Sequence, residues 1–232
     1  MRIETATGIY EGDVIGKGVR HGKGKFTYKN GNVYEGDWDN GFRHGKGRLT
    51  YPSGAYYEGD FFHNKMTGKG YYHYSTGGHY EGEFKNGEFY GFGVYVTSMG
   101  DMYKGDWFSD KKHGYGMYTW KDGSVYIGEW REGKRIGKGV YYWSDGNKYR
   151  GGFFEGKLHG QGTIIYKNGE SFSGNWNEDK WFGGGVYKTQ GGFTYKGNWE
   201  SNFNSKSVLR TRKDYRPVRG KMEIGKFIPD EK

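Results

Sequence analysis

Aromatic residues and glycines alternate with charged residues along most of the chain. In one short segment Tyr34, Gly36 and Trp38 occupy every second position, and in the next segment Gly45 and Gly47 do the same, with acidic or basic residues between them. Successive side chains of a β-strand point to opposite faces. The pattern therefore predicts two strands, each with one face of rings and glycines and one charged face.

Turn signals separate these predicted strands. Asn40-Gly41 lies between the two strands of the pair, and Ser53-Gly54 follows the second strand. Asn-Gly between two alternating segments is typical of a tight β-hairpin turn. The segment is therefore predicted to be one hairpin.

The same hairpin pattern recurs along the chain with a fixed period. The first-strand aromatic returns every 23 residues, except for a first spacing of 24, and a glycine follows it two positions later each time. These aromatics are Tyr10, Tyr34, Tyr57, Tyr80, Tyr103, Tyr126, Tyr149, Phe172 and Tyr195. A single hairpin is marginally stable, so repeated hairpins are expected to stack on their neighbours.

Composition indicates how such hairpins pack. Only 33% of the residues are hydrophobic, yet 20% are aromatic and 46 are glycine. Glycine in a strand often marks a close approach by another group. We expect paired glycines to leave slots that are filled by aromatic rings in edge-to-face contact. The acids of first strands and the bases of second strands are interpreted as pairs on a solvated face, each contributing roughly 0.2–1 kcal/mol.

The predicted fold is all-β: an elongated, twisted antiparallel meander of stacked hairpins. We expect a lead-in at residues 1–9, a repeat array at 10–204 with eight full units and a partial ninth, and a less regular basic tail at 205–232. The chain has no cysteine and no long apolar run, so a soluble protein of a reducing compartment is expected.

The repeated pattern, Tyr-x-Gly-x-Trp/Phe followed by His-Gly-x-Gly, resembles the MORN (membrane occupation and recognition nexus) repeat. The resemblance implies a groove-bearing β-meander with a scaffolding role. The first unit, YEGDVIGKGVRHGKG, has one extra residue before its His-Gly, which is similar to the opening repeat of ciliary radial spoke head subunits. The resemblance thus implies axonemal or other cytoskeletal protein partners, with location in the cytoplasm, the cytoskeleton and the axoneme of a cilium or flagellum. Self-association into a homodimer is left open.

No pattern of catalytic residues stands out. The slot before the Gly-x-Gly holds histidine in four units but Thr67, Tyr90, Ile136 or Phe182 in the others, and a catalytic base or metal ligand is not exchangeable for isoleucine. The glycine segments lack the spacing of a phosphate-binding loop. We expect no enzymatic activity, no metal, no cofactor and no nucleic-acid binding.

Two surfaces are predicted to bind partners. The first is a row of apolar outward positions, Phe92, Val94, Tyr115, Met117 and Val140, where the early units carry mainly bases. Its alternative is burial under another part of the chain. The second is the basic segment from residue 205, with nine Lys or Arg against four Asp or Glu, including Arg210, Arg212, Lys213, Arg216, Arg219 and Lys221.

The function expected first is a structural scaffold in a ciliary assembly. The basic segment leaves open a peripheral membrane adaptor that binds acidic phospholipid. A targeting module for an enzyme on a separate chain is the third possibility.

Overall fold

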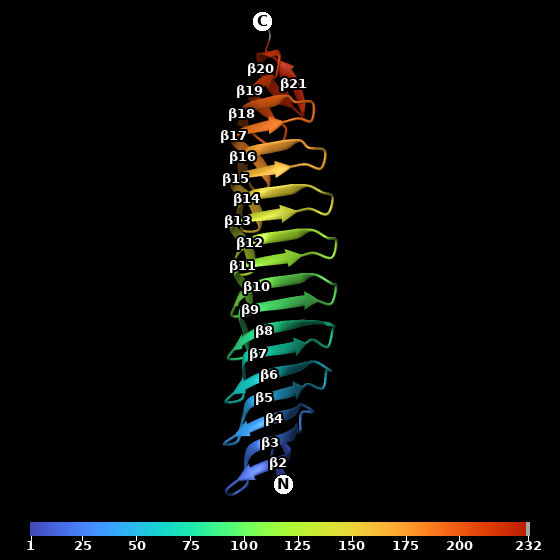
Figure 1. The fold of residues 1–232 in the computed structure, drawn as a ribbon, viewed down its shortest axis with the longest axis vertical. Helices are drawn as coiled ribbons and strands as arrows, with labels where there is room; N and C mark the ends of the chain where they lie inside the picture. Colours follow the sequence, from blue (N-terminus) through green and yellow to red (C-terminus); the bar gives the residue numbers. More distant parts are fainter. Residues whose placement is uncertain (231–232) are drawn as a thin grey trace. The chain divides into compact units, whose positions relative to one another are not determined.

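The computed structural model describes residues 1–230, and these form an all-β protein. The strands divide into two compact units, Met1–Gly114 and Tyr115–Lys232. Within each unit successive strands pair antiparallel in chain order, as the sequence predicted for stacked hairpins (Figure 1). None of the elements in residues 1–230 is a helix long and apolar enough to cross a membrane.

The first unit begins with a short strand that pairs with the first repeat. The strands are β1 (Arg2–Thr5), β2 (Gly8–Ile15), β3 (Val19–Tyr28), β4 (Val33–Asp39), β5 (Phe42–Thr50), β6 (Tyr56–Phe62), β7 (Lys65–His73), β8 (Gly78–Lys85), β9 (Glu88–Thr97) and β10 (Met102–Phe108). The next strand, β11 (Lys111–Thr119), contains the boundary between the units.

The second unit continues the same alternation of shorter and longer strands. Its strands are β12 (Val125–Arg131), β13 (Lys134–Tyr142), β14 (Lys148–Phe154), β15 (Lys157–Ile165), β16 (Ser171–Asn177), β17 (Lys180–Lys188), β18 (Thr194–Trp199), β19 (Ser205–Arg212), β20 (Tyr215–Glu223) and β21 (Lys226–Pro229).

Each repeat is a hairpin with a tight turn and one β-bulge. In β4–β5, Asn40 and Gly41 have φ of 49° and 86°, which confirms the predicted turn with two left-handed residues. The register runs through Gly36 opposite Gly47 and then shifts before Trp38. Such a bulge bends the strand and leaves an extra residue outside the ladder.

Glycines face glycines from strand to strand. Gly47 pairs with Gly36 on one side and with Gly59 on the other. A Cβ built on Gly47 overlaps the ring of Tyr34, so the ring occupies the slot that the glycine leaves. The expected packing of rings into glycine slots is confirmed. Glycine is required at position 47 because the Tyr34 ring leaves no room for a larger side chain.

Within the first unit the rings form a buried ladder on this face. Tyr34 is fully buried and meets Trp38 and Phe61 edge to face, with centroids 5.1 and 5.0 Å apart. Its hydroxyl donates to the carbonyl of Asp37 at 2.8 Å, and Trp38 Nε1 donates to the carbonyl of Gly24 at 3.0 Å. The buried polar atoms of Tyr34 and Trp38 are thereby satisfied, as burial requires.

The segment after residue 204 is more ordered than the sequence analysis expected. Strands β19, β20 and β21 extend the pairing from β18, although β19–β20 has two register shifts where a repeat hairpin has one. Val208 and Met222 are each 2% exposed and supply the apolar face of these strands. The high charge of the segment obscured this alternation.

Candidate functional site

The charged face of the first unit forms a groove. It has a volume of about 1380 Å³ and lies opposite the side chains of the ring ladder, since its walls are the intervening residues of the strands. Acids and bases are equally represented along it: Glu35, Glu58, Glu81 and Glu83 against Lys46, Arg48, Lys69 and Lys104. Tyr71, Phe92 and Val94 add apolar surface.

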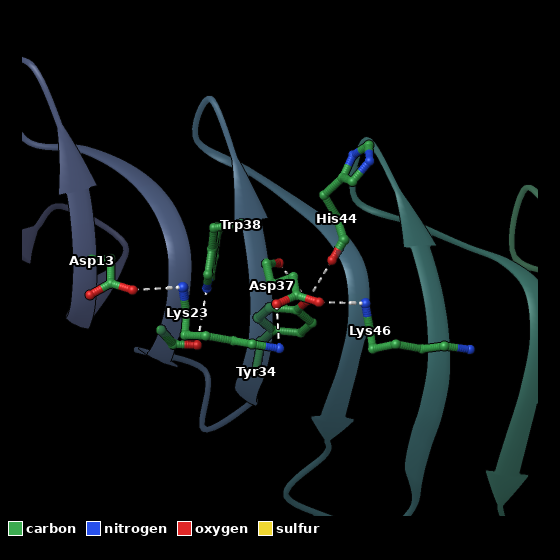
Figure 2. Close-up of polar contacts among 8 residues, drawn as sticks. Asp13, Lys23, Tyr34, Asp37, Trp38, His44 and Lys46 are labelled. Atoms are coloured by element: carbon green, nitrogen blue, oxygen red, sulfur yellow. Dashed lines mark hydrogen bonds and ion pairs between the residues drawn. The ribbon is translucent and has the colours of Figure 1, made fainter.

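In each of the first three repeats a carboxylate accepts a backbone amide, and two of these amides belong to Lys46 and Lys69, which line this groove. Figure 2 shows the second repeat. Asp37 Oδ2 accepts the backbone N–H of Lys46 at 2.9 Å, while Asp37 Oδ1 lies 2.5 Å from the ammonium of Lys23 on the preceding hairpin. The same backbone bond joins Lys23 to Asp13 and Lys69 to Asp60. The carboxylate therefore satisfies the N–H that the bulge leaves outside the ladder.

The electrostatics of Asp37 follow from these contacts. Partial burial raises the pKa of its carboxyl, but the hydrogen bond from Lys23, the backbone bond from Lys46 and the nearby positive charges outweigh it, so the pKa is lowered overall.

The sequence analysis treated Asp37 only as a charge on the solvated face. The signal that identifies its role is the constant spacing of nine or ten residues from the carboxylate to the amide it accepts.

The predicted apolar row is distributed over both units. In the first unit, Phe92 and Val94 line the groove, and Phe92 is 49% exposed. In the second unit, Tyr115 and Val140 line a separate groove of about 830 Å³, and Tyr115 is 59% exposed. Met117 is half-buried and does not line that groove. Four of the five residues thus belong to groove walls, two in each unit.

The second unit's groove is less acidic than the first. Glu129 is its one acidic wall residue, beside the bases Lys138 and Arg150 and the polar residues Gln161, Thr163 and Ser173. The grooves of the two units therefore differ in chemistry, although both are built from the same kind of repeat.

The basic segment does not present all of its cations as free charges. Arg210 lies 4.2 Å from the ring centroid of Phe227, Arg212 lies 4.8 Å from that of Phe193, and Lys221 pairs with Glu223 at 2.8 Å. Cation–π contacts of this kind stabilise the strands themselves. Lys213, Arg216 and Arg219 are exposed, and they lie in or beside β20.

The histidine slot contributes its backbone to the repeat. The carbonyl of His44 lies 3.4 Å from the Tyr34 hydroxyl, and Thr67 offers the same carbonyl to Tyr57 at 3.3 Å. Because a carbonyl accepts this bond, the bond does not depend on which side chain occupies the position. The imidazole of His44 packs on Phe62, 5.3 Å between centroids. Within residues 1–230 no group of three or more His, Asp or Glu side chains is arranged to hold a metal.

Comparison with known proteins identifies the class. Seven consecutive segments match the MORN repeat family: 10–33, 34–56, 57–79, 80–102, 103–125, 126–148 and 149–171. They cover well over half of the chain, which therefore belongs to the MORN repeat family. The eighth hairpin, β16–β17, keeps the same register of facing glycines although its first aromatic is Phe172. Curated proteins give no match.

Solved structures resemble the fold at low sequence identity. The TCP10 domain of Danio rerio CPAP, in complex with a peptide of Danio rerio STIL, is 11% identical, with a TM-score of 0.51 over 96% of this chain and 99% of that one. The TCP domain of Drosophila melanogaster SAS-4, in complex with a proline-rich motif of Ana2, is 16% identical, with a TM-score of 0.42 over 67% and 85%. At these identities the likeness concerns the fold alone.

Proposed function

We propose that this MORN-repeat protein is a non-enzymatic scaffold that binds partner proteins in a ciliary or flagellar axonemal assembly. The observation that carries the proposal is the groove in each unit, held on a frame of buried rings and facing glycines. Side chains on a paired strand frame are positioned more rigidly than on loops. Such a surface suits a protein that holds other chains at fixed positions.

The chemistry of the first groove supports a protein partner. Aromatic rings and charged pairs side by side are typical of protein interfaces, where rings fill the centre and charges set the orientation. The TCP10 domain, which shares the fold, was solved with a peptide bound. This parallel favours an extended segment of a partner as the occupant of a MORN groove.

The ciliary part of the proposal rests on the opening repeat, which resembles that of radial spoke head protein 1. The β2–β3 connection carries two left-handed glycines, Gly16 and Gly18, where the second repeat has the two-residue turn Asn40-Gly41. The inserted residue therefore changes the turn at the start of the array. The proposed location is the cytoplasm and cytoskeleton, in the axoneme.

Purification from native cells tests the proposal. The tagged full chain is recovered separately from cilia and cell bodies, in detergent and high salt. Recovery from cilia with axonemal subunits at fixed stoichiometry is expected, because an interface built on rings and desolvated pairs withstands salt. Recovery mainly from cell bodies, without stoichiometric partners, contradicts the proposal.

A peripheral membrane adaptor is the second candidate, and the exposed bases Lys213, Arg216 and Arg219 favour it. Basic residues near an acidic lipid surface contribute about 1 kcal/mol each. Sedimentation with phosphatidylserine vesicles, lost in high salt and in a variant with these three residues changed to Gln, would support it. Equal sedimentation with neutral phosphatidylcholine vesicles would contradict it.

A targeting module for an enzyme on a separate chain is the third candidate. Co-purification of an enzyme with the tagged chain would support it.

A further inference from the structure

The first unit's groove already holds one arginine between a carboxylate and a ring. Arg48 of β5 lies opposite Glu58 of β6, and its guanidinium is 3.4 Å from the Glu58 carboxylate. The same guanidinium lies 3.9 Å from the ring centroid of Tyr56. An arginine in such a place is stabilised by the opposite charge and by the face of the ring together.

The next repeat keeps the carboxylate but has lost the arginine. Tyr71 of β7 stands at the position of Arg48. It lies opposite Glu81 of β8, which is the equivalent of Glu58. On its other side Glu81 lies opposite Val94 of β9. The Glu81 carboxylate therefore has an uncharged side chain opposite it on both neighbouring strands.

This arrangement distinguishes Glu81 from the other carboxylates of the groove. Each of the others lies opposite at least one base, in the pairs Glu35 with Lys25 and Arg48, Glu58 with Arg48, and Glu83 with Lys69. Within residues 1–230 no lysine or arginine forms an ion pair with Glu81. Lys104, the next base along its row, is two strands away, at about 9.6 Å.

An exposed ring lies diagonally across from Glu81. Phe92 of β9 is two residues from Val94 on the same face of the strand, and it is 49% exposed. It stands where the second and third repeats carry Lys46 and Lys69. Diagonal neighbours on adjacent strands are about 7–8 Å apart, which is within the reach of a long side chain.

Both groups are open to the groove. Tyr71, Glu81, Phe92 and Val94 all line the groove of about 1380 Å³. Glu81 and Phe92 are exposed, so a side chain that enters the groove can reach the carboxylate and the ring from solvent. A carboxylate next to an exposed ring is complementary to a cation that also has a flat apolar face.

We propose that this part of the first unit's groove binds an arginine side chain of an extended partner segment. The guanidinium pairs with the Glu81 carboxylate and lies against the Phe92 ring, in the way that Arg48 is held one repeat earlier. Arginine fits better than lysine, because a planar guanidinium donates two hydrogen bonds to a carboxylate and also stacks on a ring. This inference rests on the proposed function, since it specifies the partner chemistry of one groove.

The test is an NMR titration of the ¹⁵N-labelled full chain at constant ionic strength. The probes are two terminally blocked tripeptides, acetyl-Gly-Arg-Gly-amide and its citrulline counterpart, in which a neutral urea replaces the guanidinium. The arginine peptide is expected to shift the amide signals of Glu81 and Phe92 saturably, and the citrulline peptide is not. Glu81→Gln should raise the dissociation constant about tenfold, the typical loss for a charged hydrogen bond. Phe92→Leu, which keeps an apolar side chain but removes the ring, should raise it about threefold.

Glu35→Gln is the matched control, because Glu35 lines the same groove but lies opposite Lys25 and Arg48. Glu35 and Glu81 are both exposed, so neither change is expected to disturb folding. Equal shifts with the two peptides would overturn the inference, and so would a loss of binding in Glu81→Gln no larger than in Glu35→Gln. Those results would leave the ciliary purification unaffected, so a failure here is distinct from a failure of the scaffold proposal.

Discussion

At the scale of single residues, the fold depends on a ring occupying the volume of a missing side chain. Tyr34 is held over Gly47 by its hydroxyl bond to Asp37, by edge-to-face contact with Trp38 and by the facing strand. The glycine therefore has a spatial role in addition to a conformational one. Two glycines in similar strands can thus have opposite tolerances for a methyl group.

Gly47→Ala is expected to destabilise the protein by about 3 kcal/mol, because the added methyl overlaps the Tyr34 ring and forces strand or ring to move. Gly184→Ala in β17 is the control, since a Cβ there meets nothing within 4 Å and its φ is not left-handed. The control is expected to be neutral or to stabilise by about 0.5 kcal/mol. Urea unfolding followed by circular dichroism measures both, and equal effects would refute the packing argument.

The hydroxyls of the buried tyrosines make stability sensitive to alkaline pH. Burial raises the pKa of the Tyr34, Tyr57 and Tyr149 hydroxyls well above the ordinary value of 10.0. The pKa of Tyr74 and of Tyr166 is raised to about 12. A pKa raised by folding stabilises the native state fully below the unfolded value and loses that contribution as pH rises above it.

The protein is therefore expected to unfold cooperatively as pH rises above 10, with phenolate absorbance appearing together with the loss of strand signal. The measurement is a parallel pH titration by absorbance and circular dichroism, with protein in guanidinium chloride as the reference for freely titrating tyrosines. Phenolate absorbance that rises fully while the strand signal is unchanged would contradict this account.

At the scale of the hairpin, the carboxylate of the first strand determines how the bulge is satisfied. Asp37 binds the Lys46 amide that the bulge turns out of the ladder, and it joins the previous hairpin through Lys23. It thus connects three strands with one side chain. Glu35, two residues earlier on the same strand, is exposed and lies opposite Arg48 and Lys25.

Asp37→Asn is expected to cost about 1–2 kcal/mol, since a charged acceptor of a backbone N–H is replaced by a neutral one. Glu35→Gln, the same charge change on an exposed side chain, should cost less than about 1 kcal/mol. Thermal unfolding at neutral pH compares the two. A loss for Glu35→Gln as large as that for Asp37→Asn would refute a special role for the bulge carboxylate.

The pH dependence of the Asp37 contribution has a definite sign. Its pKa is lowered on folding, so the unfolded state binds more protons near the ordinary value of 3.8. The stabilisation is present above that value and is lost as pH falls through it toward the lowered pKa. The stability difference between wild type and Asp37→Asn should therefore shrink on acidification, and a difference that grows would contradict the assignment.

At the scale of the whole molecule, the repeat made most of the fold predictable. The hairpins and their stacking were predicted from the 23-residue spacing, the Asn-Gly turns and the aromatic residues at every second position. This was possible because the same local sequence pattern recurs in each repeat. The bulge carboxylate was missed because its partner is a backbone amide, and no residue pattern displays a backbone donor directly. The strands after residue 204 were missed because they lack the facing glycines and carry charge on the outer positions.

The grooves were less predictable than the frame. Phe92 and Val94 were identified from the change of bases to apolar residues at outward positions, and both line the first groove. Which residues face one another across strands required the register, since only strand pairing sets Lys138 opposite Gly152. Sequence indicates which residue types a face carries, and pairing decides which of them meet.

Hydrogen–deuterium exchange of the chain, free and in the complex purified from cilia, tests the scaffold account most directly. The account predicts that the partner slows exchange at amides lining the grooves, such as those of Lys46, Lys69 and Gln161, because a bound segment excludes water there. Protection confined to residues 205–230, or no protection at any groove amide, would contradict it.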